Sequence, residues 1–269
     1  YTHQVLVRLK QTDHGILRNG IWAYTNERLC KDDLITVQIV ENECSDNIAP
    51  VNLPLDIAYE DDDIIVINKP FDMPAHPSAG NHDNTLANAL MYYYGSQNKP
   101  FVYRCINRLD RDTTGLTIVA KHALAGGILG NAVAKRAIHR TYYAVCSGCT
   151  PACMRISAPI ARKDASTIER CVDFKRGENA VTDFIRIKYN PDNNLSLVKL
   201  RLLTGRTHQI RVHMKYIGFP LIGDFLYNPD YTYISRQALH SGRLVFTHPV
   251  TGQKMNLISD IPSDMKSLF

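Results

Sequence analysis

The sequence predicts an α+β fold, with a large mixed, mainly antiparallel sheet flanked by helices and a small β-rich module in front of it. Apolar, β-branched runs typical of buried strands occur at 64–67, 116–120 and 195–203. Strand-like segments outnumber helical ones and alternate with them irregularly, which does not favour repeated βα units. Because 269 residues suffice for one large and one small domain, we expect a small module over 1–50 and a main domain over 55–269.

The first 50 residues contain two clear β signals. Asn19-Gly20 is typical of a tight hairpin, and residues 34–40 form an apolar strand pattern. The outline is similar to the end of the small RNA-binding module first recognised in a ribosomal small-subunit protein, with a shortened helical front. An accessory hairpin without an RNA role accounts for the pattern equally well. The acidic, Asn- and Pro-containing stretch 41–54 is expected to be a linker.

In the main domain, the spacing of apolar residues predicts the remaining elements. We expect helices over 85–94, 122–139 and 207–217, and strands over 64–67, 116–120, 140–146, 180–189 and 195–203. Thr207 is the expected N-cap of the last helix and Gly218 its end. Ile210, Met214 and Ile217 then share one apolar face.

Charge and cysteine content set limits on the partners. Lys and Arg outnumber Asp and Glu by 31 to 26, a balance that permits a polyanionic partner without requiring one. The segment 201–215 has several cations and no acid, and Arg206 and His208 are candidates for phosphate contact. His208 and His213 are five residues apart and do not share a helical face, so we expect no metal between them.

The seven cysteines are scattered, which favours reduced thiols and a cytoplasmic location. The only ligand-like pair, Cys146 and Cys149, lacks a second pair to complete a zinc site, and we expect no metal. No apolar run approaches the length of a membrane span, so we expect no membrane attachment.

A polar loop followed by a buried strand occupies residues 107–121. Asp110 lies between Arg108 and Arg111, and arginine keeps its charge at any working pH. A carboxylate so placed should remain ionised, which suits a nucleophile or a base better than a general acid. A solvated loop of mixed charge fits the same pattern.

Three segments together resemble one family. Arg108-Leu-Asp-Arg-Asp-Thr-Thr-Gly, Arg140-Thr-Tyr-Tyr-Ala-Val and Leu203-Thr-Gly-Arg-Thr-His-Gln-Ile-Arg-Val-His-Met are similar to the signature motifs of RluA/RluD-type RNA pseudouridine synthases. Asn68-Lys-Pro, Pro220-Leu-Ile-Gly-Asp and Leu239-His-Ser resemble that family in order and spacing. Two departures are visible: Asn107 stands where the family usually has His, and Thr114 where it often has Ser.

The resemblance implies the pseudouridine-synthase catalytic fold over 55–269 and an enzyme that needs no cofactor. The uridine would be flipped out of the RNA stack, and its base cut from N1, turned and rejoined through C5. The implied partner is ribosomal or transfer RNA, and we expect a monomer. The carboxylate of Asp110 could attack the base, attack the sugar or remove a ribose proton.

The resemblance also implies roles for three further residues. Arg211 would pair with Asp110 and hold it ionised. Tyr142 would stack on the uracil and take part in proton movement. Arg108 would fill the gap that the flipped base leaves, because a flat guanidinium stacks as a base does.

Two other functions fit parts of the sequence. Asp110, Asp112 and Thr114 match the DxDxT loop of Mg²⁺-dependent phosphotransferases, although in those enzymes a helix follows the loop, whereas here a strand is expected at 116–120. A non-catalytic RNA-binding protein would use the N-terminal module and the basic stretch 201–215. Such a protein would not need Asp110, Tyr142 and Arg211 together.

Overall fold

The computed structural model describes residues 7, 9–24, 26–39, 43–78, 80–164 and 168–269. Parts of the expected N-terminal module and linker, residues 1–6, 8, 25 and 40–42, lie outside the described residues. No helix of the described chain is long and apolar enough to cross a membrane.

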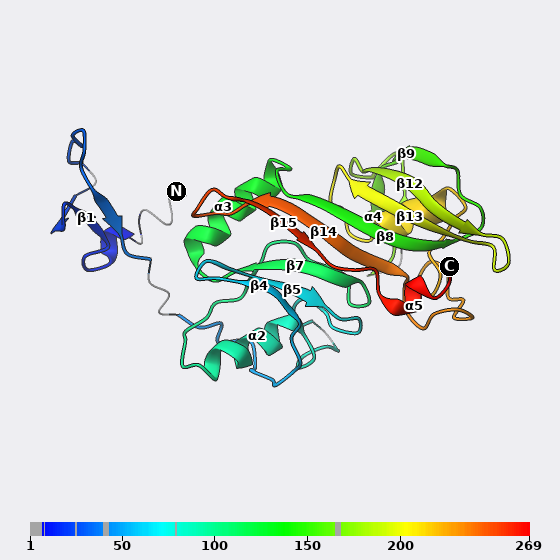
Figure 1. The fold of residues 1–269 in the computed structure, drawn as a ribbon, viewed down its shortest axis with the longest axis horizontal. Helices are drawn as coiled ribbons and strands as arrows, with labels where there is room; N and C mark the ends of the chain where they lie inside the picture. The colour runs from blue at the N-terminus through cyan, green and yellow to red at the C-terminus, as the bar shows by residue number, and fades with distance from the viewer. Residues whose placement is uncertain (1–6, 8, 25, 40–42, 79, 165–167) are drawn as a thin grey trace.

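A ten-stranded sheet forms the centre of the fold (Figure 1). Its strands pair in the order β4-β5-β7-β14-β8-β13-β12-β9, with β15 beside β14 and β6 beside β7. The strands are β4 (Ile57–Glu60), β5 (Ile64–Lys69), β6 (Arg104–Cys105), β7 (Thr114–Ala120), β8 (His139–Ser147), β9 (Cys153–Ser157), β12 (Val181–Asn190), β13 (Leu195–Leu202), β14 (Leu239–Thr247) and β15 (Lys254–Ile258). The expected strands are therefore confirmed, with shifts of one or two residues at their ends.

The middle of the sheet is buried on both faces. On β5, Ile65 and Ile67 face a hydrophobic cluster with helix α2 (Leu86–Gly95), while Ile64 and Val66 face a second cluster with helix α3 (Ala123–Ala134). A strand buried on both faces has no polar side to show, which explains its unbroken apolar sequence.

The sheet is mixed, as expected, because one central pair runs parallel. Among the described strands, only β7 and β14 pair in parallel, with Gly115 opposite Ser241. Gly115 has φ +106°, and a Cβ there would lie 2.3 Å from the carbonyl oxygen of Ser241. Only glycine fits at this crossing.

Two helices differ from the sequence prediction. The helix expected over 122–139 is α3 and ends at Ala134, because Arg136 adopts a positive φ of 57° and β8 begins at His139. The helix expected over 207–217 is α4 (Gln209–Tyr216), and Thr207 is not its cap. His208 is the N-cap residue instead, in a left-handed conformation with no side-chain capping bond. A short helix, α5 (Ser263–Lys266), lies near the C-terminus.

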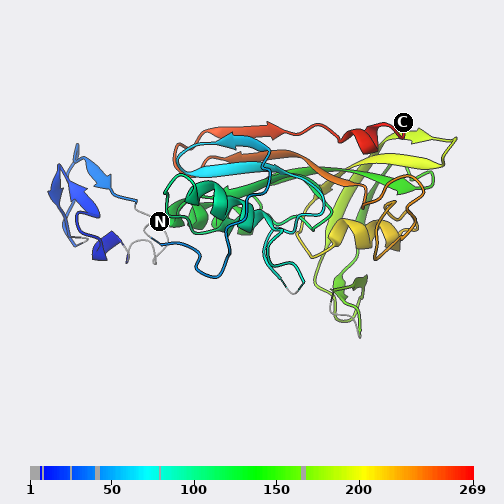
Figure 2. The same cartoon turned by 90° about the horizontal axis from the view of Figure 1, so that it is seen from below.

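Two small sheets accompany the large one. The strands β2 (Ile21–Trp22), β1 (Ile16–Arg18) and β3 (Ile35–Val37) form a separate three-stranded sheet (Figure 1). Asn19 and Gly20 both have positive φ, which confirms the predicted hairpin turn. The hairpin of β10 (Ile160–Arg162) and β11 (Arg170–Val172) projects from the large sheet on the side of α4, as Figure 2 shows.

Candidate active site

The loop that carries Asp110 is fixed from inside by Asn107. The buried Asn107 side chain accepts a hydrogen bond from the Ile118 N–H (2.9 Å) and donates to the Leu116 carbonyl (3.3 Å). Its own carbonyl accepts from the Thr117 hydroxyl at 2.6 Å. The departure from the family pattern at this position therefore holds the loop against β7, and it does not reach Asp110.

The far end of the same loop is held by the segment that leads into β14. The Gln237 amide donates to the Thr113 hydroxyl at 2.6 Å, and the Thr114 hydroxyl lies 2.9 Å from His240 Nδ1. Burial lowers the pKa of His240 to about 4, so its imidazole is neutral. His240 is thus structural, and Asp110 lies between two anchored ends.

Arg211 provides the charge partner of Asp110. Its guanidinium Nη1 donates to Asp110 Oδ2 at 2.9 Å, although the two residues are 101 positions apart in the sequence. Arg211 is 1% exposed and its guanidinium carbon lies 5.0 Å from the Tyr227 ring and 5.4 Å from the Phe225 ring. The predicted pair of Asp110 with Arg211 is present, and aromatic faces enclose the cation.

A second carboxylate, Asp224, holds the other edge of the guanidinium. Its two oxygens accept from Arg211 Nε and Nη2, both at 2.7 Å, and Asp224 is completely buried. Asp224 Oδ1 also accepts the N–H groups of Leu226 and Tyr227. Burial alone would lower the pKa of Arg211, but the bonds to Asp224 and the charge of Asp110 outweigh it and raise that pKa.

Of the two carboxylates that bind Arg211, only that of Asp110 is accessible to solvent. Asp224 is buried and its two oxygens are used by Arg211. The Asp110 side chain is 32% exposed, so one face of it is open to a substrate. An oriented and accessible carboxylate can act as a nucleophile or as a base.

Tyr142 lies in the same part of the fold. It is 4% exposed, on β8, and pairs across the sheet with Ser241 of β14. Its ring belongs to the hydrophobic cluster that contains Leu109 and Ile210. Because these residues immediately precede Asp110 and Arg211, the cluster connects the strand of Tyr142 with the two segments that carry the Asp110–Arg211 pair.

His208 forms a further side of the site. Its Nδ1 lies 3.0 Å from the Tyr227 hydroxyl, and its Nε2 lies 3.9 Å from Asp110 Oδ2. Burial lowers the pKa of His208, which favours the neutral imidazole beside Asp110. His208 was expected to contact RNA phosphate, and the structure places it next to the Asp110 carboxylate.

Lys69 was missed as a residue of the site. In the sequence it appears only within the motif Asn68-Lys-Pro, but in the structure Lys69 is 1% exposed, and its ammonium donates to the carbonyls of Pro70 (2.6 Å) and Arg111 (2.8 Å). Burial lowers its pKa to about 7, against the opposing charges of Asp112 and Asp110. Through the Arg111 carbonyl, Lys69 ties β5 to the residue that follows Asp110.

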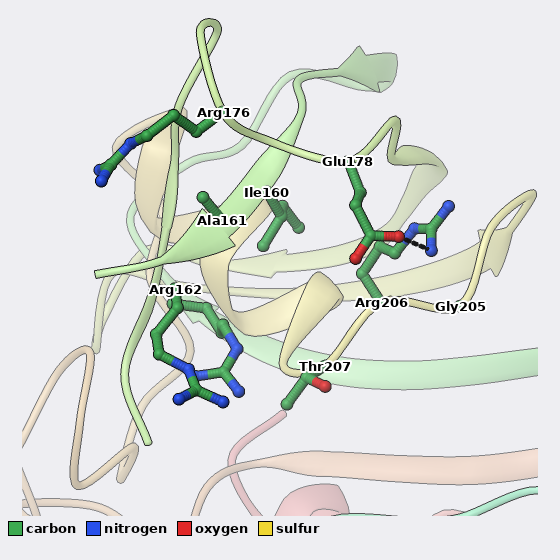
Figure 3. Close-up of a pocket in the computed structure, with 9 residues that line it drawn as sticks. Ile160, Ala161, Arg162, Arg176, Glu178, Gly205, Arg206 and Thr207 are labelled. Atoms are coloured by element: carbon green, nitrogen blue, oxygen red, sulfur yellow. Dashed lines mark hydrogen bonds and ion pairs between the residues drawn. The ribbon is translucent and has the colours of Figure 1, made fainter. Parts of the chain in front are cut away.

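The two remaining predicted residues occupy different surroundings. Arg108 is exposed on the Asp110 loop. Arg206 is paired with the Glu178 carboxylate and donates to the Asn179 carbonyl at 3.1 Å. It lines a separate pocket between β10 and the start of α4 (Figure 3).

One side-chain group among the described residues has spacing that a metal ion would accept, Asp61, Asp63 and His248. His248 Nε2 lies 2.8 Å from Asp61 Oδ2, and its Nδ1 accepts the N–H groups of Val250 (3.4 Å) and Thr251 (3.1 Å). The backbone therefore engages Nδ1 of His248, and Oδ1 of Asp63 lies 2.8 Å from His122 Nε2. We interpret this group as a hydrogen-bonded cluster.

A model of the RNA pseudouridylate synthase family matches residues 63–216, more than half of the chain. The chain belongs to the RNA pseudouridylate synthase family. It is 41% identical over 253 residues to an uncharacterised RNA pseudouridine synthase of Bacillus subtilis, covering 93% of this chain and 88% of that relative. It is also 41% identical over 283 residues to the ribosomal large subunit pseudouridine synthase D of Haemophilus influenzae, covering 100% of this chain and 86% of that relative.

The comparison with solved structures indicates the same family. Human RNA pseudouridylate synthase domain containing 1 superposes with a TM-score of 0.65 at 26% identity, covering 77% of this chain and 83% of that one. This pseudouridylate synthase therefore has the expected fold and is an enzyme that isomerises uridine to pseudouridine in RNA. The phosphotransferase interpretation of the Asp110 loop is not favoured, since β7 rather than a helix follows it.

Asp224 and Lys69 could have been found from the sequence only through their motifs. Asp224 closes Pro220-Leu-Ile-Gly-Asp, and Lys69 is the middle residue of Asn68-Lys-Pro, both of which resemble the family. Neither motif states a role. That Asp224 meets Arg211, and that Lys69 is buried under the Asp110 loop, depends on contacts between distant segments.

Proposed function

We propose that this synthase modifies uridines in large-subunit ribosomal RNA and that Asp110 is its catalytic carboxylate. The relatives named ribosomal large subunit pseudouridine synthase D support the substrate class, with identities of 38% in Zymomonas mobilis and 41% in Haemophilus influenzae. The partly exposed carboxylate of Asp110, held by Arg211, carries the assignment of the site.

The reaction exchanges one bond of the nucleotide for another. The bond from ribose C1′ to uracil N1 breaks, the uracil turns, and a bond forms from C1′ to C5. The C5 proton is released and N1 becomes protonated, so substrate and product have the same composition. No oxidant, reductant or group donor is consumed, and the chemistry requires no cofactor. Asp110 attacks or deprotonates the flipped nucleotide and is regenerated at the end.

Arg211 and Asp224 keep Asp110 in its working form. Arg211 fixes the direction of the Asp110 carboxylate through the 2.9 Å hydrogen bond and places a positive charge beside it. Asp224 fixes Arg211 in turn, from a completely buried position. A preorganised pair of this kind need not rearrange when charge develops in the reaction.

Tyr142 and Arg108 act on the bases. The ring of Tyr142, which belongs to the same hydrophobic cluster as Leu109, stacks on the flipped uracil. Arg108, exposed on the loop next to Asp110, occupies the space that the uracil leaves in the RNA stack. His208, neutral and 3.9 Å from Asp110, is available for a hydrogen bond to the nucleotide.

The division of labour along the chain is also a proposal. Residues 55–269 act as the catalytic domain, and residues 1–50 as an accessory module that contacts RNA outside the target site. The separate pairing of β1, β2 and β3 supports this division. The seven free cysteines support a reducing compartment, and we place the enzyme in the cytoplasm as a monomer.

Pseudouridine mapping tests this function. Total RNA from cells with and without the protein is compared, and we expect at least one site in large-subunit ribosomal RNA to lose its pseudouridine when the protein is absent. Restoring the wild-type protein should restore that site. Loss of a site in transfer RNA alone would overturn the substrate class but leave the reaction intact.

The same reaction in vitro separates isomerisation from phosphoryl transfer. A transcript containing the mapped site is incubated with the purified enzyme in the presence of excess EDTA. We expect full pseudouridine formation, because the proposed steps use only Asp110 and protons. Loss of activity with EDTA, restored by Mg²⁺, would favour a metal-dependent reaction at this loop.

A further inference from the structure

A basic pocket lies next to the active site. It has a volume of about 480 Å³ and lies between the β10–β11 hairpin and the loop that precedes α4. Four arginines and a single glutamate are among its lining residues: Arg162, Arg170, Arg176, Arg206 and Glu178. Figure 3 shows Arg162 on the hairpin side and Arg206 on the loop side, with Arg206 joined to Glu178.

Two of the four arginines are already neutralised. Arg176 bonds to both Asp164, at 2.7 and 3.1 Å, and Asp173, at 2.8 Å. Arg206 is paired with Glu178. These guanidiniums have internal carboxylate partners, so they do not by themselves call for a ligand.

Arg162 and Arg170 are different. They are direct cross-strand partners in the β10–β11 pair, and like charges in that position repel each other. The Arg170 guanidinium donates to the carbonyls of Ile168 and Glu169, both at 3.1 Å, and within the described residues neither arginine contacts a carboxylate. An anion bound between the two guanidiniums would relieve this repulsion.

The pocket is connected to the catalytic carboxylate through a short chain of contacts. The backbone N–H of Arg170 donates to the Tyr227 hydroxyl at 2.9 Å, and that hydroxyl lies 3.0 Å from His208 Nδ1. His208 Nε2 lies 3.9 Å from Asp110. An anion in the pocket would therefore lie close to a nucleotide bound at Asp110.

We propose that Arg162 and Arg170 bind a backbone phosphate of the substrate RNA, close in sequence to the flipped uridine. This inference rests on the proposed function, since it assumes an RNA strand at Asp110. Phosphate is the anion that an RNA strand presents at every nucleotide, and paired guanidiniums bind it through bidentate hydrogen bonds. The two residues position the strand and take no part in the chemistry.

The test uses Arg162→Gln, Arg170→Gln and the double variant in the full-length protein. Binding to an RNA that the wild type modifies is measured at several salt concentrations. Each neutralised phosphate contributes about 0.7 to 0.9 to the slope of log K against log[salt], and the two arginines share one phosphate, so the slope of the double variant should be smaller by about 0.7 to 0.9. Its affinity should fall roughly tenfold or more, with a matching rise in KM and an unchanged kcat.

Arg243→Gln is the matched control. Arg243 is an exposed arginine on β14 whose guanidinium contacts a neutral amide, that of Asn256, at 2.8 Å. This variant should keep the wild-type slope and KM. If the double variant behaves like Arg243→Gln, the phosphate site does not exist. A fall in affinity with an unchanged salt slope would contradict it as well.

A substitution with the opposite effect adds a second test. Glu178→Gln removes the carboxylate that neutralises Arg206 and leaves the other lining arginines in place. RNA should then bind more tightly and with a steeper salt slope; unchanged or weaker binding would count against the pocket. If the wild type forms no pseudouridine in any RNA, the proposed function is wrong. If the wild type is active but none of these substitutions changes RNA binding, only the phosphate site is wrong.

Discussion

The buried partner of Arg211 should matter for stability, and its exposed partner for activity. Asp224→Asn keeps the shape of the side chain and one oxygen able to accept the N–H groups of Leu226 and Tyr227. It removes the negative charge and places an amide N–H₂ against a guanidinium N–H, where two donors face each other. The substitution therefore isolates the loss of the buried ion pair.

The magnitude follows from burial. Arg211 is 1% exposed and Asp224 is fully buried, so removing one partner leaves a cation without its main counter-charge away from water. Breaking such a pair costs about 3–5 kcal/mol, which for a chain of this length lowers the melting temperature by on the order of 10 °C. Activity should fall too, because Arg211 is no longer held against Asp110.

Asp110→Asn is the matched comparison. The Asp110 side chain is 32% exposed, and in this variant Arg211 keeps both bonds to Asp224 and both aromatic contacts. Solvent screens the Asp110–Arg211 pair, which therefore contributes less to stability than the buried Asp224–Arg211 pair. The free energy of unfolding should change by no more than about 1 kcal/mol. Pseudouridine formation should nevertheless be lost.

Thermal melting by circular dichroism and urea unfolding at pH 7 measure both variants beside the wild type. The expected result is a large drop in stability for Asp224→Asn and almost none for Asp110→Asn. Equal destabilisation by the two substitutions would refute the distinction between a buried and an exposed partner. A stable Asp224→Asn variant would show that Arg211 does not depend on Asp224.

Three further predictions concern other contacts. Gly115→Ala should unfold the protein or lower its melting temperature sharply, because the new Cβ would lie 2.3 Å from the Ser241 carbonyl; normal melting would contradict this close approach. Lys69 has its pKa lowered from 10.5 to about 7 by burial, so the native state releases a proton that the unfolded chain keeps. Urea unfolding measures the free energy of unfolding of the wild type and of Lys69→Met between pH 7 and pH 9. The value of the wild type should rise relative to that of the variant by about 1.4 kcal/mol per pH unit. A difference in unfolding free energy that does not change with pH would show that Lys69 titrates normally. Tyr142→Phe keeps the stacking ring and should lower kcat with little change in melting temperature; full activity would exclude proton movement by the hydroxyl.

The part of the site that lies in continuous motifs could be predicted from the sequence. Asp110 stands in a polar loop before an apolar strand, and the strand and loop are both present as expected. Arg211 and Tyr142 lie in segments similar to those of a known family, and the shared cluster of Leu109 and Ile210 brings these segments together.

What remained hidden depends on long-range geometry. Nothing in the local sequence distinguishes Asp224 from other acidic residues. Its role depends on the fold, which brings its two oxygens to Arg211 on α4. The left-handed conformation of His208, which replaces the expected Thr207 cap, is set by the contacts around it, since local sequence favours a capping threonine. The pairing of Arg162 with Arg170 depends on the register of the β10–β11 hairpin. A shift of one residue in that register would move one side chain to the opposite face.

The most direct measurement is pseudouridine formation by Asp110→Asn on an RNA that the wild type modifies, with binding of the same RNA measured in parallel. We expect no pseudouridine at any enzyme concentration, with RNA affinity within a few-fold of the wild type. Product formation at the wild-type rate would show that the carboxylate held by Arg211 is not the catalytic group.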